Sequence, residues 1–456
     1  MANNPSLVEY IAQAQRGLYQ RVFGPEFLLK QSYFTVDTAT GIFNTTYGKK
    51  VWHAVNNQVR FFNALPRVVW GNVPGWRIRT DRGSGRSRPI TETGTLPTVD
   101  ISDIATVSSL PRIVGTTFGA SVKAIFTANL EGGIGDVLAM EQENAQLDHI
   151  KEINEELLAG SAYVASAGDG TTFTVPATIA HHFKIGDVVT KWDTSDNAWE
   201  NTSGVAVSSA VDSTGVVTTA ATTDAWADGD IAAIYSRSGF TSIDDIVTYD
   251  GVRYGGGDTV SAYAADGGVR AYDLTYAGRA AAGNWNCAAR VDSNNGVTRD
   301  LSLNLIDNCI RDVRVRGGEP KLILCGHDQY YKMQRLLNAA QRYMGQEEYQ
   351  VGVGNERTFP GTRTGLVLAT YQGIPVLPDA DTPKSVAADD SVLGSNVYVL
   401  DTDYLEIAVA QPTQYIENRD FFAVNSLVIR GLLYTMGELR ATGFNRQAKC
   451  VDLTEN

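Results

Sequence analysis

The sequence predicts an α+β fold divided among several domains. Three observations support this prediction: an arginine-rich stretch has strand periodicity, a later stretch has helix periodicity, and the last part of the chain is mainly extended. These segments are Trp76–Thr91, Ile134–Leu158 and Val397–Leu453. With 456 residues, 43% of them hydrophobic and 20% charged, the chain is long enough for more than one folded core.

The arginine-rich stretch predicts a β-hairpin. Trp76 and Ile78 alternate with arginines, the pattern of a strand with two unlike faces. Residues 81–85 are rich in turn formers, and the return strand is expected to end near Pro89. The arginines are Arg77, Arg79, Arg82, Arg86 and Arg88. Five positive charges against Asp81 give residues 76–91 a net charge of +4, and because the chain carries −13 the remainder carries −17.

A second extended stretch is expected over Val114–Ala128, and a long amphipathic helix follows it. Apolar residues from Ile134 to Leu158 recur mostly three or four positions apart, and Gly160 is a suitable helix stop. The polar side of this helix carries Glu141, Glu143, Asp148, Lys151 and Glu155.

Residues 161–238 differ in composition from their surroundings and are dense in Gly, Ser, Thr, Ala, Val and Asp. Short β patterns separated by turn formers predict a small all-β barrel or sandwich, inserted as a surface projection. The expected strands are Thr172–Val175, Val188–Trp192, Gly204–Val211, Gly215–Ala220 and Ile231–Tyr235. The sequence does not decide whether this segment contacts carbohydrate, a decoration protein, a host surface or a neighbouring subunit.

The pattern becomes mixed after this segment. Helices are expected over Leu301–Val313 and His327–Arg342, on either side of a buried strand at Lys321–Cys325. Further strands are expected at Leu366–Thr370, Ile374–Leu377, Val397–Leu400, Glu406–Ala410, Phe421–Leu433 and Gly437–Thr442.

Composition excludes several classes of protein. A net charge of −13 argues against a general nucleic-acid binder, which needs a basic face. We find no apolar run long enough to span a membrane and no secretory signal pattern at the N-terminus, so we expect a product kept in the cytoplasm of its producer cell. The four cysteines have no metal-site spacing and are expected to be buried free thiols.

No residue pattern points to catalysis, a cofactor or a metal. A GxSxG motif is absent, and the glycines at 255–257 lack the Lys-Ser/Thr of a phosphate loop. We interpret His181-His182 as part of a solvated loop, Asp244-Asp245 as surface acidity, and Cys325 as a buried thiol beside a histidine that starts a helix.

The order of these segments resembles the major capsid proteins of tailed viruses, with the Hong Kong ninety-seven type of fold. The resemblance rests on stretches that follow one another in the order typical of that family. They are Thr91–Pro97, Gly115–Leu130, Phe240–Ile246, Pro320–Leu337, Tyr371–Pro378, and Val397–Thr402 followed by Gln411–Glu417.

The resemblance implies a domain plan. It comprises an N-terminal arm (1–67), an extended loop (68–113), a peripheral domain with a spine helix (114–160), the inserted β domain (161–238), an axial domain (239–396) and peripheral return strands (397–456). It also implies self-assembly into pentamers and hexamers of an icosahedral shell around double-stranded DNA, in a virion assembled in the host cytoplasm. A portal, a scaffold and a maturation protease are the implied partners, a decoration protein is possible, and DNA contact is expected to be weak and non-specific.

The extended loop is the expected inter-subunit contact, with Trp76 as an anchor and Arg77, Arg79, Arg82, Arg86 and Arg88 facing an acidic neighbour. Nucleic-acid binding or a merely solvated loop are the other interpretations of these arginines. Residues 70–112 contain no lysine, so the covalent cross-linking of some relatives is not expected. The alternative functions are an encapsulin-like compartment, an extracellular β-rich adhesin, and a hydrolase or lyase.

Overall fold

The computed structural model describes residues 59–455 with internal gaps. The residues left out in this range are 72–74, 81–86, 88, 91, 95, 98–100, 129–135, 161, 167, 177–179, 194–197, 200–203, 212–213, 221–224, 229, 248–253, 256–284, 286, 293–297, 341–369, 385–393 and 419–426. The predicted N-terminal arm therefore lies almost entirely outside the described residues. Within them the chain forms two compact units, one of which contains Val114–Lys151 and Gln411–Thr435.

Four strands form the sheet with the longest members. Its order is β1 (Arg67–Val69), β18 (Leu405–Asn418), β19 (Val428–Ala441) and β4 (Arg112–Ser121), with β1 parallel to β18. The prediction of two separate strands around Gly437 was wrong, because β19 continues through that residue. A Cβ at Gly437 would lie 2.7 Å from the carbonyl oxygen of Ala408, so the glycine permits close approach of β18 instead of ending a strand.

The predicted extended stretch over Val114–Ala128 is only half extended. Strand β4 ends at Ser121, and helix α3 (Val122–Ala128) follows at once. The Ser121 hydroxyl accepts a hydrogen bond from the backbone N–H of Ala124 at 3.1 Å, which satisfies one of the donors at the start of a helix. This serine cap explains why the helix begins where strand periodicity alone predicted more strand.

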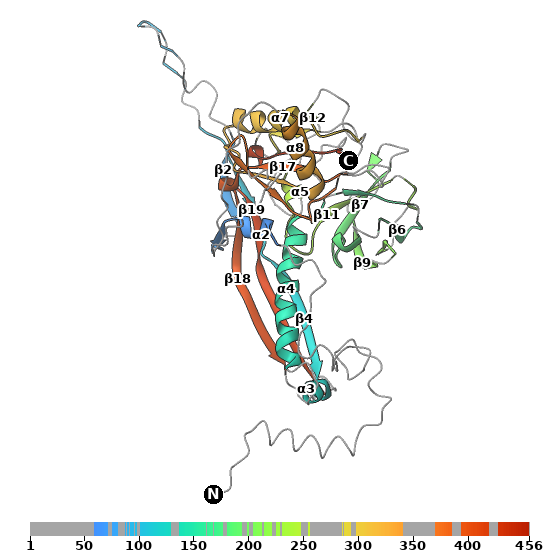
Figure 1. Ribbon diagram of the computed structural model, residues 1–456. Coiled ribbons are helices and arrows are strands. Elements are labelled where there is room, and N and C mark those ends of the chain that lie inside the picture. Colours follow the sequence, from blue (N-terminus) through green and yellow to red (C-terminus); the bar gives the residue numbers. More distant parts are fainter. Residues whose placement is uncertain are drawn as a thin grey trace, which may run out of the picture. The chain divides into compact units, whose positions relative to one another are not determined.

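The predicted long helix is present as α4 (Val137–Leu157), and Asp136 caps its start. In the first unit α4 lies alongside β4 and β19 (Figure 1). His149 makes this contact, since it is buried, with Nδ1 3.0 Å from the Thr116 hydroxyl and Nε2 2.7 Å from the Thr435 hydroxyl. One histidine of the helix is thus bonded to two strands of the sheet.

An antiparallel sheet occupies most of residues 162–236. Its order is β5-β11-β7-β9-β10-β6, with β8 paired to β7. Phe173, Phe183 and Trp226 lie in its core, and the rings of Phe173 and Trp226 are 4.4 Å apart. The five predicted strands are confirmed within two residues, whereas β5 and β8 were not predicted. The strands are β5 (Ala162–Val164), β6 (Thr172–Thr174), β7 (Val188–Asp193), β8 (Ala198–Trp199), β9 (Val205–Val211), β10 (Val216–Thr219) and β11 (Ile231–Ser236).

A mixed seven-stranded sheet has the order β12-β13-β20-β17-β14-β16-β15. Helix α7 (Leu303–Val315) packs on β13, β17 and β20, and helix α8 (His327–Ala340) contacts β16. The strands are β12 (Tyr254–Gly255), β13 (Arg290–Asp292), β14 (Leu322–Cys325), β15 (Thr370–Tyr371), β16 (Ile374–Pro378), β17 (Val397–Leu400) and β20 (Ala448–Cys450). Two of them, β17 and β20, come from the segment that we grouped with the return strands, yet they pair with strands of the predicted axial segment. The remaining short elements are α2 (Phe61–Ala64), α5 (Ile243–Ile246), η3 (Ala180–His182), η7 (Thr402–Tyr404) and η8 (Phe444–Arg446).

Candidate functional site

Within the predicted extended loop (68–113), two strands form an antiparallel ribbon. Strand β2 (Gly75–Arg79) pairs with β3 (Ile104–Ser108), so that Trp76 lies opposite Val107. The predicted return strand, which carries Arg86 and Arg88, lies largely outside the described residues, and the partner that the structure gives β2 is the later strand β3. Ile104 and Val107 are β-branched residues suited to a strand, whereas the segment before Pro89 is mostly Gly, Ser and Arg.

The two faces of the ribbon differ as the alternation predicted. Arg77 and Arg79 are exposed, and Trp76 and Ile78 are half-buried. Arg82, Arg86 and Arg88 lie outside the described residues. The described part of the loop therefore presents two arginines on one face.

Trp76 contacts its own chain. The guanidinium of Arg440 on β19 lies 5.9 Å from the centre of the Trp76 ring, and its Nε donates to a Glu406 carboxylate oxygen of β18 at 2.7 Å. A cation at this distance is attracted by the negative face of the ring. This contact helps to hold the base of the ribbon, and the expected role of Trp76 as an anchor on a neighbouring copy stays a prediction.

Sequence reasoning missed a set of exposed apolar side chains on the loop. Each of them is between 52% and 82% exposed, so the loop presents apolar surface as well as charge. They are Ile90, Leu96, Ile101, Ile104, Leu110 and Ile113. The sequence could have indicated this exposure, because these apolar residues are spaced irregularly along a segment that otherwise consists mainly of residue types common in loops.

The predicted polar residues of α4 differ in environment. Glu143 and Asp148 are exposed, whereas Glu141, Lys151 and Glu155 are half-buried. Burial raises the pKa of Glu141, and a hydrogen bond from the Asn144 amide opposes that rise. The helix therefore has a narrower solvated face than the sequence pattern suggested.

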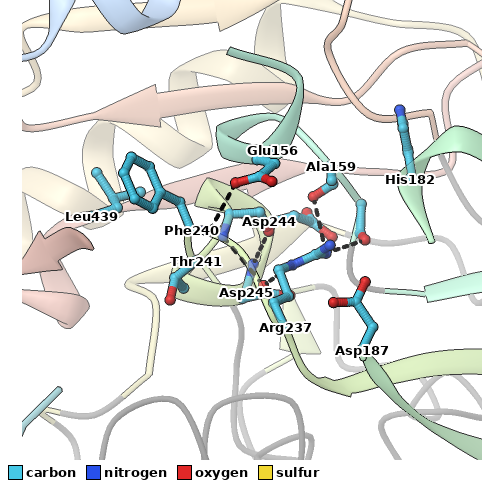
Figure 2. Close-up of polar contacts among 12 residues, drawn as sticks. Glu156, Ala159, His182, Asp187, Arg237, Phe240, Thr241, Asp244, Asp245 and Leu439 are labelled. Carbon is cyan, nitrogen blue, oxygen red and sulfur yellow. Dashed lines mark hydrogen bonds and ion pairs between the residues drawn. The ribbon is translucent and has the colours of Figure 1, made fainter. Parts of the chain in front are cut away.

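A buried polar cluster lies where the chain enters and leaves the residues 161–238 (Figure 2). Arg237, which follows β11, is its centre. Its Nε donates to an Asp245 carboxylate oxygen at 2.6 Å, and its Nη2 donates to the Gly160 carbonyl at 2.5 Å. One side chain thus bonds Gly160, three residues after the end of α4, to the segment that follows the β sheet.

Asp245 is the third residue of α5 and is held in place by the cap of that helix. Ser242 is the N-cap of α5, and its hydroxyl accepts from the Asp245 N–H at 3.2 Å while the Asp245 carboxylate accepts from the Ser242 N–H at 3.3 Å. This reciprocal capping box orients the carboxylate toward Arg237. The neighbouring Asp244 accepts from Lys449 at 2.6 Å and from the Tyr398 hydroxyl at 2.7 Å. Both aspartates are buried, so the interpretation of Asp244-Asp245 as surface acidity was wrong.

Glu156, near the end of α4, lies on the other side of this cluster (Figure 2). Its carboxylate accepts a hydrogen bond from the Phe240 N–H at 2.9 Å. Burial raises the pKa of Glu156 to about 8. A Cβ at Gly239 would lie 2.4 Å from the Glu156 oxygens, so any other residue there would force this carboxylate to move.

Two further contacts complete this polar cluster, which we call the junction between residues 161–238 and the segments before and after them. Lys184 pairs with Glu152 at 2.6 Å, and Asp187 accepts from the Ser238 N–H at 2.7 Å. Burial lowers the pKa of Lys184, but the charge and hydrogen bond of Glu152 and the charges of Glu156 and Glu155 together outweigh burial, so the net shift is upward. Each contact joins a loop of the inserted sheet to a residue at one of its two connections.

Glu438 on β19 is a second buried carboxylate. It accepts from the Thr241 N–H at 2.7 Å and pairs with Arg112 at 3.1 Å. Burial raises its pKa to about 7, although Arg112 and the backbone donor oppose that rise.

His182 was expected in a solvated loop, and that interpretation was wrong. It is buried and its Nδ1 hydrogen-bonds the Tyr163 hydroxyl, which also accepts from the Gly160 N–H at 2.6 Å. Cys325 is a buried thiol just before α8, as predicted. Within the described residues no group of three or more His, Cys, Asp or Glu side chains could hold a metal ion.

The junction does not resemble a reaction centre. Its cations and carboxylates bond one another and the backbone, so they are committed to structure. The described helices include none that is long and apolar enough to cross a membrane. The described part of the loop exposes charged and apolar side chains, whereas the junction is buried.

Comparison with known proteins identifies the family. The family model described as SU10 major capsid protein matches residues 76–424, which is most of the chain. The chain belongs to this family of major capsid proteins and is a structural component of a virion capsid. A comparison with curated proteins gave no match.

Solved structures of low sequence identity are also similar. The capsid of cyanophage A-1(L) is 13% identical, with 89% of this chain and 96% of that chain covered, at a TM-score of 0.49. The capsid of a native GTA particle is 10% identical, with 99% of each chain covered, at a TM-score of 0.44. A holo-SrpI encapsulin complex from Synechococcus elongatus PCC 7942 is 8% identical, with 93% and 97% covered, at a TM-score of 0.40.

Proposed function

We propose that this chain forms pentamers and hexamers of a closed icosahedral shell around double-stranded DNA, and that the extended loop (68–113) lies on an adjacent copy. The observation that carries the proposal is the composition of the loop surface, where Arg77 and Arg79 are exposed on a ribbon whose loop also exposes apolar side chains. An exposed surface of mixed charged and apolar character is typical of a contact site between proteins.

Electrostatics supports a second copy of the chain as the contact. Residues 76–91 carry +4 within a chain of net charge −13, so the loop and the rest of an identical copy have opposite charge. Exposed ion pairs contribute only about 0–1 kcal/mol each. Burying a large apolar side chain contributes about 1.5–3 kcal/mol, so the exposed isoleucines and leucines supply most of the contact energy.

The remaining parts of the proposal follow from charge and family. The acidic balance favours weak, non-specific contact with packaged DNA, since strong binding needs many basic residues against the phosphates. The role is structural and not catalytic. Assembly takes place in the host cytoplasm, with a portal, a scaffold and a maturation protease as partners.

Charge reversal on the ribbon tests the proposal. Purified Arg77→Glu/Arg79→Glu protein is expected to keep the circular dichroism and unfolding midpoint of the wild type but to form few or no shells, as counted by negative-stain electron microscopy. The matched control, Arg77→Lys/Arg79→Lys, keeps both charges and is expected to assemble. Shells of normal number and size from the glutamate variant would refute the proposed contact. Images of wild-type particles also distinguish a DNA-filled head from a compartment that holds protein cargo.

A further inference from the structure

Two of the four cysteines lie together in the core of the mixed sheet. Cys309 is on α7 and Cys450 is on β20, and their Sγ atoms are 3.1 Å apart. Both side chains are fully buried and both are free thiols. The two residues are 141 positions apart in the sequence, so only the fold brings them together.

Rigid elements on both sides set this distance. Cys309 is on the buried face of α7, next to Ile310 and Val313 in the same hydrophobic core. Cys450 lies in a central strand that pairs with β13 on one side and β17 on the other. The sulfur atoms are only about 1 Å farther apart than in a disulfide bond, so small side-chain rotations would close the gap.

We propose that Cys309 and Cys450 are a redox-sensitive pair that forms an intrachain disulfide under oxidising conditions. With hydrogen peroxide as oxidant, one thiolate attacks a peroxide oxygen and the O–O bond breaks. Hydroxide is the leaving group, and the cysteine becomes a sulfenic acid. The second thiolate then attacks the sulfenic sulfur, and hydroxide leaves again as the S–S bond forms. Two thiols and one hydrogen peroxide give one disulfide and two waters, so that sulfur loses two electrons and peroxide gains them.

The environment makes this reaction slow and its product stable. The hydrogen bond with Cys450 and burial both raise the pKa of Cys309, so little of it is the reactive thiolate. The pair therefore stays reduced where thiol reductants dominate and oxidises gradually where they are absent. Once formed, the bond constrains a long segment of the unfolded chain and joins α7 to the strand at the C-terminal end of the fold.

Thiol counting on the purified full-length protein tests the proposal independently of shell formation. The reduced protein is treated with dilute hydrogen peroxide, unfolded in the presence of iodoacetamide, and weighed by intact mass spectrometry. Two of the four cysteines are expected to escape alkylation, and peptide mapping is expected to find Cys309 linked to Cys450. Reduction with dithiothreitol should restore four alkylated cysteines and lower the midpoint of urea unfolding.

Variants separate this pair from the other thiols. Cys309→Ala and Cys450→Ala should each keep all three remaining thiols under the same treatment, whereas Cys325→Ala should lose two of its three. Four alkylated cysteines after treatment of the wild type, oxidation to sulfinic acid without a cross-link, or a link through any other cysteine would each overturn the proposal.

Discussion

Arg237 is the residue on which the buried junction depends most. It bonds Asp245 and the Gly160 carbonyl, and all of these groups are buried. Arg237→Met should lower the free energy of unfolding by about 3–5 kcal/mol, because it leaves the Asp245 carboxylate buried without its cation. Urea unfolding followed by tryptophan fluorescence measures this loss.

A matched control is Arg311→Met on α7. Its side chain is 60% exposed, and a substitution there should change stability by no more than about 0.5 kcal/mol. Equal stability of the two methionine variants would show that the junction is not held by its buried ion pair.

Glu156 makes stability depend on pH at the same junction. Its pKa is about 8 in the folded protein and 4.5 in a solvated chain, so between these values the folded form holds a proton that the unfolded form has released. The stability that the preferential protonation of Glu156 in the folded protein contributes is therefore lost as the pH rises through this window. Glu156→Gln removes the titration, so the variant should gain stability relative to wild type with rising pH, by an amount on the order of a few kcal/mol. The urea midpoint of Glu156→Gln minus that of the wild type should therefore increase as the pH rises through this window. A difference that stays constant would contradict the raised pKa of Glu156.

At the scale of elements, His149 joins α4 to the long strands. Its two ring nitrogens bond Thr116 on β4 and Thr435 on β19. His149→Ala should cost about 2 kcal/mol or more, because the half-buried Thr116 hydroxyl and the buried Thr435 hydroxyl each lose a partner and a cavity is left. Gln146→Ala, at an exposed position of the same helix, is the control and should be nearly neutral. Thermal melting that does not separate the two variants would show that the histidine is dispensable.

The elements that could be predicted from sequence are those whose pattern is local and long. The apolar stripe predicted α4, and short strands separated by turn formers predicted β6, β7, β9, β10 and β11. Pairing across distance could not be predicted in this way. The local sequence pattern does not indicate that β2 pairs with residues 104–108. The placement of β17 and β20 in one sheet with β14 likewise depends on the whole fold.

Candidate site residues show the same limit at finer scale. The exposure of Arg77 and Arg79 followed from strand alternation, and it is confirmed. The burial of Asp244, Asp245 and His182 could not be predicted, because these residue types are usually found at the surface. Their respective partners, Lys449, Arg237 and Tyr163, lie elsewhere in the sequence. A buried charge is predictable only together with its partner.

For the whole molecule, the exposed apolar side chains of the loop should decide whether copies associate. Leu110→Asp should abolish shells while leaving the urea midpoint of the monomer unchanged, because Leu110 is 73% exposed in the isolated chain. Ile185→Asp is the matched control, since this residue is 72% exposed but lies in the inserted segment. Particle counts by electron microscopy and sedimentation compare the two variants. Assembly of the Leu110 variant at the level of the control would assign the contact energy to another surface.

The most direct measurement is a cryo-electron microscopy map of the assembled wild-type particle in which neighbouring copies can be traced. The account predicts that the loop of residues 68–113 lies on an adjacent copy, with Arg77 and Arg79 facing acidic side chains and Leu110 covered. A map in which that loop lies only on its own chain or projects into solvent would contradict the account.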